Sequence, residues 1–198
     1  YINRMLEAIH RTGNRKPVFY NVSHNEYVVE AYYETAIQGT TYQWYPIGLV
    51  SGQTQQGNFL PYIKKCAELG FDALEVACGA FHLSDDQTFR ELNAMAQYYG
   101  MKLTGGYGPR PEHNLASTDE TMVKNAFAFY SDIFRKMELA GIDRIGGALY
   151  SYWPVDFSKK FDKHADTERS IKRMSQLADI ASNHGITLCM ETLNRFEG

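Results

Sequence analysis

The sequence predicts an α/β fold built on a parallel sheet, and three observations support this prediction. From about residue 58 onward one unit recurs: a helix-start signal, apolar residues at helical spacing, a glycine and a short β-prone run. The links from each helix to the next strand are only one or two residues long, whereas the segments after the strands are long and rich in glycine, proline and aromatic residues. Strict alternation of this kind requires parallel strands joined by helical crossovers.

Five strands separated by four helices are expected. The first strand is predicted at residues 45–50, and each of the other four follows a glycine that ends a helix. These glycines are Gly70, Gly100, Gly141 and Gly185, and the strands after them are predicted at 71–76, 101–104, 142–145 and 186–190.

The helices are predicted from N-caps and apolar faces. Two residue pairs fit the capping box and two residues fit simple caps. The pairs are Ser84 with Gln87 and Ser117 with Glu120, and the simple caps are Asn58 and Asp166. The apolar faces are Phe89, Leu92, Ala96 and Tyr99 in one helix, Met122, Ala126, Phe129, Ile133 and Met137 in the next, and Ile171, Met174, Ala178 and Ala181 in the last.

Two architectures fit this alternation, a doubly wound open sheet and a TIM barrel. Both place function at the C-terminal ends of the strands, and long loops at those ends are especially marked in TIM barrels. No Gly-x-Gly-x-x-Gly follows the first predicted strand, which disfavours dinucleotide binding.

Residues 1–41 follow a different pattern, with a short strand at 18–20 and a helix at 26–37, and we interpret them as an N-terminal extension of unknown role preceding residues 42–198.

The composition limits the class of protein. The chain has 198 residues, of which 44% are hydrophobic and 22% charged, and its net charge is -3. This balance is ordinary for a globular protein and disfavours a broadly basic nucleic-acid binder. No apolar run approaches the roughly 20 residues of a membrane span, and no secretory signal is recognisable.

Three cysteines without a Cys-x-x-Cys pair are expected to be reduced core residues, so we expect a cytoplasmic protein.

Glu191, which closes the last predicted strand, is the main candidate for chemistry. A carboxylate at this position is expected to face a barrel or cleft, and burying it unpaired would cost several kcal/mol. A bound cation or a proton relay would compensate, and so would an ion pair with Arg195, so the spacing leaves both interpretations open. Glu197 lies six residues later in the following loop, where a solvated carboxylate is the default.

Trp153 is the second candidate. It lies in the glycine-rich segment 146–154 that follows the fourth predicted strand. Small residues in this segment permit a ligand to approach the backbone closely. The indole could stack on the C–H face of a sugar, or it could pack the loop onto the rest of the fold.

These segments carry a resemblance to a known family. Residues 145–156 (IGGALYSYWPVD) resemble the fourth-strand loop of the D-psicose (D-allulose) and D-tagatose 3-epimerases. Residues 190–197 (METLNRFE) resemble the fifth-strand signature of that family, and residues 69–75 (LGFDALE) are similar to its second-strand entry. The three motifs occur in the order that the family has.

The resemblance implies a (β/α)8 TIM barrel of the xylose isomerase-like superfamily, truncated here after the fifth strand. It implies a ketose 3-epimerase that acts on a small ketose, of the D-fructose/D-psicose or D-tagatose type, by proton exchange at C3 through an enediolate. It also implies a cytoplasmic homo-oligomer without nucleic-acid or membrane partners. The implied cofactor is a divalent metal ion, Mn²⁺ first, with Co²⁺ or Mg²⁺ accepted.

The resemblance also implies residue roles. Glu191 matches a metal ligand that is also one of two acid/base catalysts, Glu197 matches a carboxylate that hydrogen-bonds the ketose near C1 and C2, and Trp153 matches an aromatic residue of the sugar pocket. The other three metal ligands of the family lie on later strands, so the 198-residue chain alone is expected to be inactive.

Two alternatives are another sugar isomerase or inosose dehydratase of the same superfamily, and a non-enzymatic sugar-binding or remnant half-barrel.

Overall fold

The computed structural model describes residues 19–21, 41–43, 59–68, 73–158, 160 and 162–193. It divides into two compact units, Tyr1–Thr104 and Gly105–Gly198, each of which is described by itself. The strand predicted at 45–50, the helix predicted at 26–37, the cap at Asn58 and the stop at Gly70 lie outside the described residues. No helix of the described part is long and apolar enough to span a membrane.

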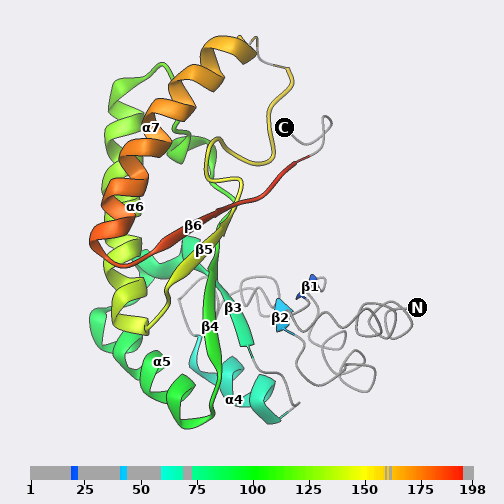
Figure 1. Ribbon diagram of the computed structural model, residues 1–198, viewed down its shortest axis with the longest axis vertical. Coiled ribbons are helices and arrows are strands. Elements are labelled where there is room, and N and C mark those ends of the chain that lie inside the picture. The colour runs from blue at the N-terminus through cyan, green and yellow to red at the C-terminus, as the bar shows by residue number, and fades with distance from the viewer. Residues whose placement is uncertain are drawn as a thin grey trace, which may run out of the picture. The chain divides into compact units, whose positions relative to one another are not determined.

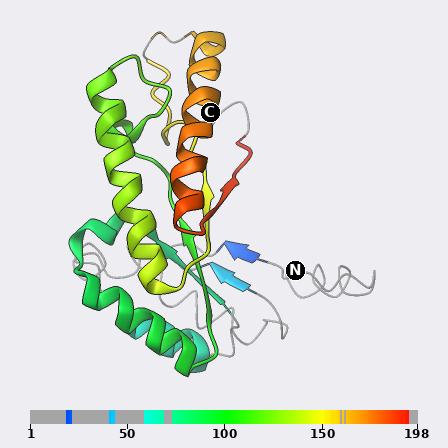
Figure 2. The ribbon, with the colours of Figure 1, turned by 60° about the vertical axis from the view of Figure 1, so that its left-hand side comes forward.

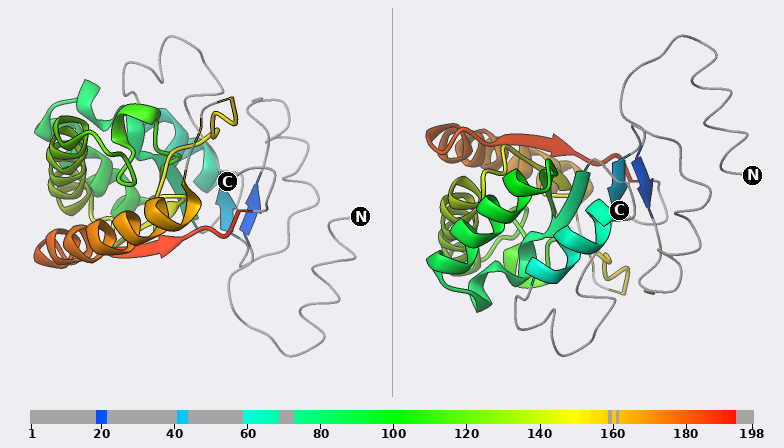
Figure 3. Two further views of the ribbon diagram at one scale, coloured as in Figure 1. Left: turned by 90° about the horizontal axis from the view of Figure 1, so that it is seen from above. Right: turned by 90° about the horizontal axis from the view of Figure 1, so that it is seen from below.

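The described part of the first unit contains three complete strands, which run parallel, and the start of a fourth. β1 (Phe19–Asn21) pairs with β2 (Thr41–Gln43), and Figure 3 shows the two strands side by side. β2 pairs in turn with β3 (Ala73–Ala77), which confirms the strand predicted at 71–76. β1 confirms the strand predicted at 18–20 with a shift of one residue.

An aromatic cluster forms the centre of this unit. Phe81 is fully buried, and its ring centroid lies 5.4 Å from that of Phe59 and 4.6 Å from that of Phe89. The three rings join the start of one helix, a 3-10 helix and the next helix into one apolar core. These elements are α4 (Leu60–Glu68), η1 (Cys78–Leu83) and α5 (Asp86–Tyr98).

The second unit contains the end of β4 and two further parallel strands. Gly105 and Gly106 of β4 (Lys102–Gly106) pair with β5 (Arg144–Gly147), and β5 pairs with β6 (Thr187–Met190). Helices α6 and α7 run side by side, as Figures 1 and 2 show. They cover Glu120–Ala140 and Lys163–Asn183, and the short helix η2 covers Pro111–His113. The prediction of parallel strands alternating with helices is therefore confirmed.

The glycine stops and two of the helical faces are confirmed as well. Gly100, Gly141 and Gly185 follow α5, α6 and α7 with φ of +67°, +69° and +67°. The predicted faces of α5 and α6 point into the core at most positions. The buried members are Phe89, Leu92, Ala96, Ala126, Ile133 and Met137.

The predicted N-caps are wrong by one to four residues. The helices α5, α6 and α7 are capped by aspartates whose carboxylates accept hydrogen bonds from backbone N–H groups of the first turn, namely Asp85, Asp119 and Asp162. Ser117 instead accepts a hydrogen bond from the N–H of Asp119, and Asp166 lies inside α7. An ionised carboxylate is a stronger acceptor than a hydroxyl and interacts favourably with the helix dipole. Where a serine and an aspartate both lie near the helix start, the aspartate therefore forms the cap.

The buried face of α7 also differs from the prediction. Ile171 is 62% exposed and Ala178 is exposed, although both were predicted to face the core. The face that is buried consists of Ser170, Arg173, Leu177 and Ala181, of which Ala181 alone was predicted. Apolar periodicity misses this face because half of its members are polar side chains that are buried with hydrogen-bond partners.

β6 is the most exposed strand of the second unit. Thr187, Cys189 and Met190 are exposed, and among the described strands only β5 pairs with β6. Cys189 is therefore not the core residue that the sequence predicted, whereas Cys66 and Cys78 are buried as expected.

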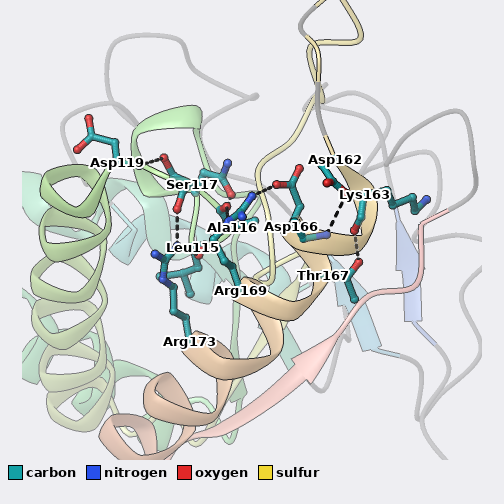
Figure 4. A network of polar contacts seen from close by, with 12 residues as sticks. Leu115, Ala116, Ser117, Asp119, Asp162, Lys163, Asp166, Thr167, Arg169 and Arg173 are labelled. Carbon is teal, nitrogen blue, oxygen red and sulfur yellow. Dashed lines mark hydrogen bonds and ion pairs between the residues drawn. The ribbon is translucent and has the colours of Figure 1, made fainter.

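Two arginines of α7 bind the loop that precedes α6 (Figure 4). The buried Arg173 donates hydrogen bonds to the carbonyl oxygens of Leu115 at 2.6 Å and Ser117 at 2.5 Å. Arg169 donates to the carbonyl oxygen of Ala116 at 2.9 Å. Three consecutive loop carbonyls are thus satisfied by α7, which fixes the loop to the helix.

Replacing Arg173 with methionine should lower the free energy of unfolding by about 2–4 kcal/mol, because buried carbonyls lose their donor and Glu120 loses its partner at 2.8 Å. Urea denaturation of the chain measures the change. The control is Arg110→Met, because the Arg110 side chain is 61% exposed and its Nη1 lies 3.9 Å from Oε1 of Glu112. It should cost less than about 1 kcal/mol. Equal losses in both variants would contradict a specific role for the buried guanidinium.

Candidate functional site

The two glycines that end β5 connect the residues that follow the neighbouring strands. The carbonyl oxygen of Gly146 accepts a hydrogen bond from the N–H of Tyr107, after β4, at 2.9 Å. The carbonyl oxygen of Gly147 accepts one from the N–H of Glu191, after β6, at 3.0 Å. These are the carboxyl ends of parallel strands, the edge at which α/β proteins bind ligands.

Gly147 is a position that only glycine fits. Its φ is +137°, and a Cβ built on it would collide with the carbonyl oxygen of Tyr107. The backbones of Gly147 and Tyr107 can therefore pass this closely only because glycine has no side chain.

Glu191 is held by its main chain on both sides. Its N–H donates to Gly147, and its carbonyl oxygen accepts a hydrogen bond from the hydroxyl of Tyr150 at 3.1 Å. The side chain is exposed, contrary to the expectation that it would be enclosed. Among the described strands only β5 pairs with β6, so no described strand lies along the other edge of β6.

Trp153 lies in the loop after β5 and is 48% exposed. Its backbone N–H donates to the carbonyl oxygen of Pro109, in the loop after β4, at 2.8 Å. The six-membered ring of the indole lies beside Gly108, since a Cβ built there would be 3.9 Å from Cε3. The indole is thus anchored by its backbone while part of its ring is open to solvent.

An aromatic cluster that the sequence did not indicate supports the loop after β4. Tyr107 is buried, and its hydroxyl lies 2.5 Å from Nδ1 of His113. The His113 ring stacks on Phe129 of α6 with the ring centroids 3.6 Å apart. Burial raises the pKa of the neighbouring Tyr130 hydroxyl well above its ordinary value, and Tyr107 adds to the shift. Sequence spacing cannot reveal that a loop histidine meets a helix face.

A cavity of about 940 Å³ lies next to the loop after β5. Its walls come from the loop before α6, the loop after β5, the first turns of α7 and Leu193. Tyr150 and Tyr152 line this cavity, whereas Trp153 and Glu191 do not. The cavity is therefore distinct from the surface that carries the two candidate residues.

The described residues contain no group of three or more His, Cys, Asp or Glu side chains that could hold a metal ion. Glu191 fits the role of a single ligand, because its carboxylate has the hard oxygen donors that Mn²⁺ and Mg²⁺ prefer. The described part of the chain does not supply a complete ligand set. Arg195, the proposed ion-pair partner, and Glu197 lie outside the described residues.

The role of Gly147 can be tested by adding one methyl group. Gly147→Ala should lower the free energy of unfolding by about 3 kcal/mol or more, because backbone strain and the collision with Tyr107 add together. The control is Gly185→Ala, at φ +67° with no atom near the added Cβ, which should cost about 1–2 kcal/mol. Thermal or urea unfolding measures both. A Gly147→Ala variant as stable as the control would show that the close passage is not needed.

Comparison with known proteins finds similarity to a barrel family and to curated sugar epimerases. The family described as xylose isomerase-like TIM barrel matches residues 63–198. The chain is 43% identical over 145 residues to a D-psicose 3-epimerase of Ruminiclostridium cellulolyticum, covering 73% of this chain and 50% of that protein. It is 40% identical over 139 residues to a D-psicose 3-epimerase of Agrobacterium fabrum, covering 70% and 48%. The chain thus spans about half the length of the curated relatives it matches.

Solved structures agree with this result. The crystal structure of D-psicose 3-epimerase with D-tagatose from Clostridium cellulolyticum H10 matches with a TM-score of 0.69 at 44% identity, covering 71% of this chain and 49% of that one. An L-ribulose 3-epimerase matches with a TM-score of 0.61 at 19% identity, which shows a shared fold alone. The predicted fold, part of a TIM barrel, and the resemblance to D-psicose 3-epimerases are confirmed.

Proposed function

The chain belongs to the xylose isomerase-like TIM barrel family, and we propose that it forms part of a metal-dependent ketose 3-epimerase. The observation that carries the proposal is the 43% identity over 145 residues to a D-psicose 3-epimerase. Because the chain spans half of that relative, the activity is proposed for the complete barrel, of which this chain supplies part. We expect the protein that carries the complete barrel to be a cytoplasmic homo-oligomer.

The proposal assigns proton transfer at C3 of the ketose to Glu191. Inversion at C3 requires that a proton leaves on one face, giving an enediolate, and returns on the other. The Glu191 carboxylate removes or returns the proton on one face, and a second group of the complete assembly acts on the opposite face. The hydrogen bonds to Gly147 and from Tyr150 support this role, because they fix the main chain that carries the carboxylate.

A divalent ion would add electrostatic stabilisation. Mn²⁺ is expected, with Co²⁺ or Mg²⁺ as alternatives, and Glu191 would be one of its ligands. When bound, such an ion polarises the ketose carbonyl and stabilises the negative charge that develops on the substrate oxygens.

Two further residues are proposed to bind the sugar. Trp153 would stack on an apolar face of the ketose, which is consistent with its half-exposed ring and its anchored backbone. Glu197 would accept hydrogen bonds from the hydroxyl groups near C1 and C2. The ketose pair would be D-fructose and D-psicose or a D-tagatose-type pair.

A second candidate is a non-enzymatic half-barrel that binds sugar without converting it. A direct test compares the 198-residue chain with a chimera in which it is joined to the half of the R. cellulolyticum enzyme that it does not match. With Mn²⁺ and D-fructose, the chimera should form D-psicose and the chain alone should not, as measured by chromatography. The unmatched half alone is the control.

The outcomes separate the candidates. Turnover by the 198-residue chain alone would refute the predicted inactivity. A folded chimera that acts on aldoses or inososes instead of ketoses would favour another isomerase or an inosose dehydratase. A folded chimera that binds ketoses without converting them would support the second candidate, a non-enzymatic half-barrel.

Within the active chimera, Glu191→Gln should lower kcat by about 10²–10⁴-fold, because an amide cannot take up the C3 proton. Exchange of the C3 hydrogen with deuterated water should fall in parallel. Glu138→Gln is the matched control, since Glu138 is exposed and pairs with His184 at 2.8 Å on the helical surface. Undiminished turnover in Glu191→Gln would remove Glu191 from the mechanism.

A further inference from the structure

We propose that Tyr150 is a positioning residue that sets the direction of the Glu191 side chain. The two residues are 41 positions apart, and the Tyr150 hydroxyl donates to the Glu191 carbonyl oxygen at 3.1 Å. Tyr150 comes from the loop after β5, and Glu191 follows β6. The importance of this bond for catalysis rests on the proposed function, whereas its effect on the main chain does not.

The hydrogen bonds of Glu191 fix both peptide groups that flank its Cα. The N–H of the preceding peptide donates to Gly147 at 3.0 Å, and the carbonyl of the following peptide accepts from Tyr150. With both peptide planes held, φ and ψ of Glu191 are held, and these angles determine where Cβ points. Because the side chain is exposed, packing does not direct it, so these two backbone bonds do.

Tyr150 has a rigid support of its own. The hydroxyl of Ser170, a buried residue of α7, donates to the carbonyl oxygen of Tyr150 at 2.6 Å. The neighbouring Arg169 and Arg173 bind the loop before α6 (Figure 4). This end of α7 is therefore tied to two loops. Ser170 therefore anchors Tyr150, and Tyr150 anchors Glu191.

Tyr152 provides a matched control from the same loop. Its hydroxyl accepts a hydrogen bond from the N–H of Asp156 at 3.2 Å, and it lines the same cavity as Tyr150. Tyr150→Phe and Tyr152→Phe each remove one hydroxyl oxygen and keep the ring. Only the first removes a bond to Glu191.

The first experiment measures hydrogen exchange of the Glu191 amide in the 198-residue chain by NMR. Tyr150→Phe should accelerate this exchange by about threefold to tenfold, the effect of losing one hydrogen bond. Tyr152→Phe should leave it within about twofold of the unsubstituted chain. Unchanged exchange in Tyr150→Phe, or equal acceleration in both variants, would overturn the inference.

The second experiment uses the chimera and reads out metal binding as well as kinetics. Tyr150→Phe should weaken Mn²⁺ binding, measured by calorimetry without substrate, by about tenfold, as is typical when a group that supports a ligand is lost. It should lower kcat more than it changes KM for D-fructose. Ser170→Ala should act in the same direction, and the double variant should resemble Tyr150→Phe, because Ser170 acts through Tyr150.

The two experiments test the proposed function and the positioning role of Tyr150 separately. An unsubstituted chimera that neither binds Mn²⁺ nor converts D-fructose would overturn the proposed function, while the exchange comparison would still decide the role of Tyr150. Accelerated exchange in Tyr150→Phe alone supports the positioning role. Additive effects of Ser170→Ala and Tyr150→Phe would overturn the anchoring of one residue by the other.

Discussion

The two consecutive carbonyl groups at the end of β5 are the constraint on which the candidate site depends. One accepts a hydrogen bond from Tyr107 after β4, and the other accepts one from Glu191 after β6. The residues that follow all three strands are therefore tied to a single dipeptide, Gly146 and Gly147. The arrangement is possible because the backbone of Tyr107 passes where a side chain on Gly147 would otherwise lie.

Polar contacts, together with aromatic packing, connect the loops of this edge to the helices. Loop carbonyls have no ladder partners, so buried ones must be satisfied by side chains or water. Three side chains of α7 perform this task, and two of them, Ser170 and Arg173, occupy the buried face that an apolar helix would use for packing. These side chains are Arg169, Arg173 and Ser170. The exposure of Ile171 is the consequence, since a helix cannot turn both faces toward the loops.

The dipeptide organises the part of the candidate site that the described residues contain. Trp153 and Glu191 are each anchored by backbone hydrogen bonds while their side chains remain exposed. Anchored and exposed side chains are suited to meeting a ligand or a second part of a barrel, because little rotational freedom of the backbone is lost on contact. This agrees with a chain that spans half the length of its curated relatives.

The sequence by itself determined the parallel α/β class, the strands after Gly100, Gly141 and Gly185, the buried faces of α5 and α6, and the likeness to ketose 3-epimerases. These features depend on local patterns within one helix or strand, or on contiguous motifs. Only the tertiary structure decided which residues cap the helices, which face of α7 is buried, and how Tyr107 meets His113 and Phe129. It also decided that Tyr150 reaches Glu191, because such a contact depends on how β5, β6 and α7 are placed in space, and side-chain hydrogen bonds between distant residues leave no periodic trace in the chain.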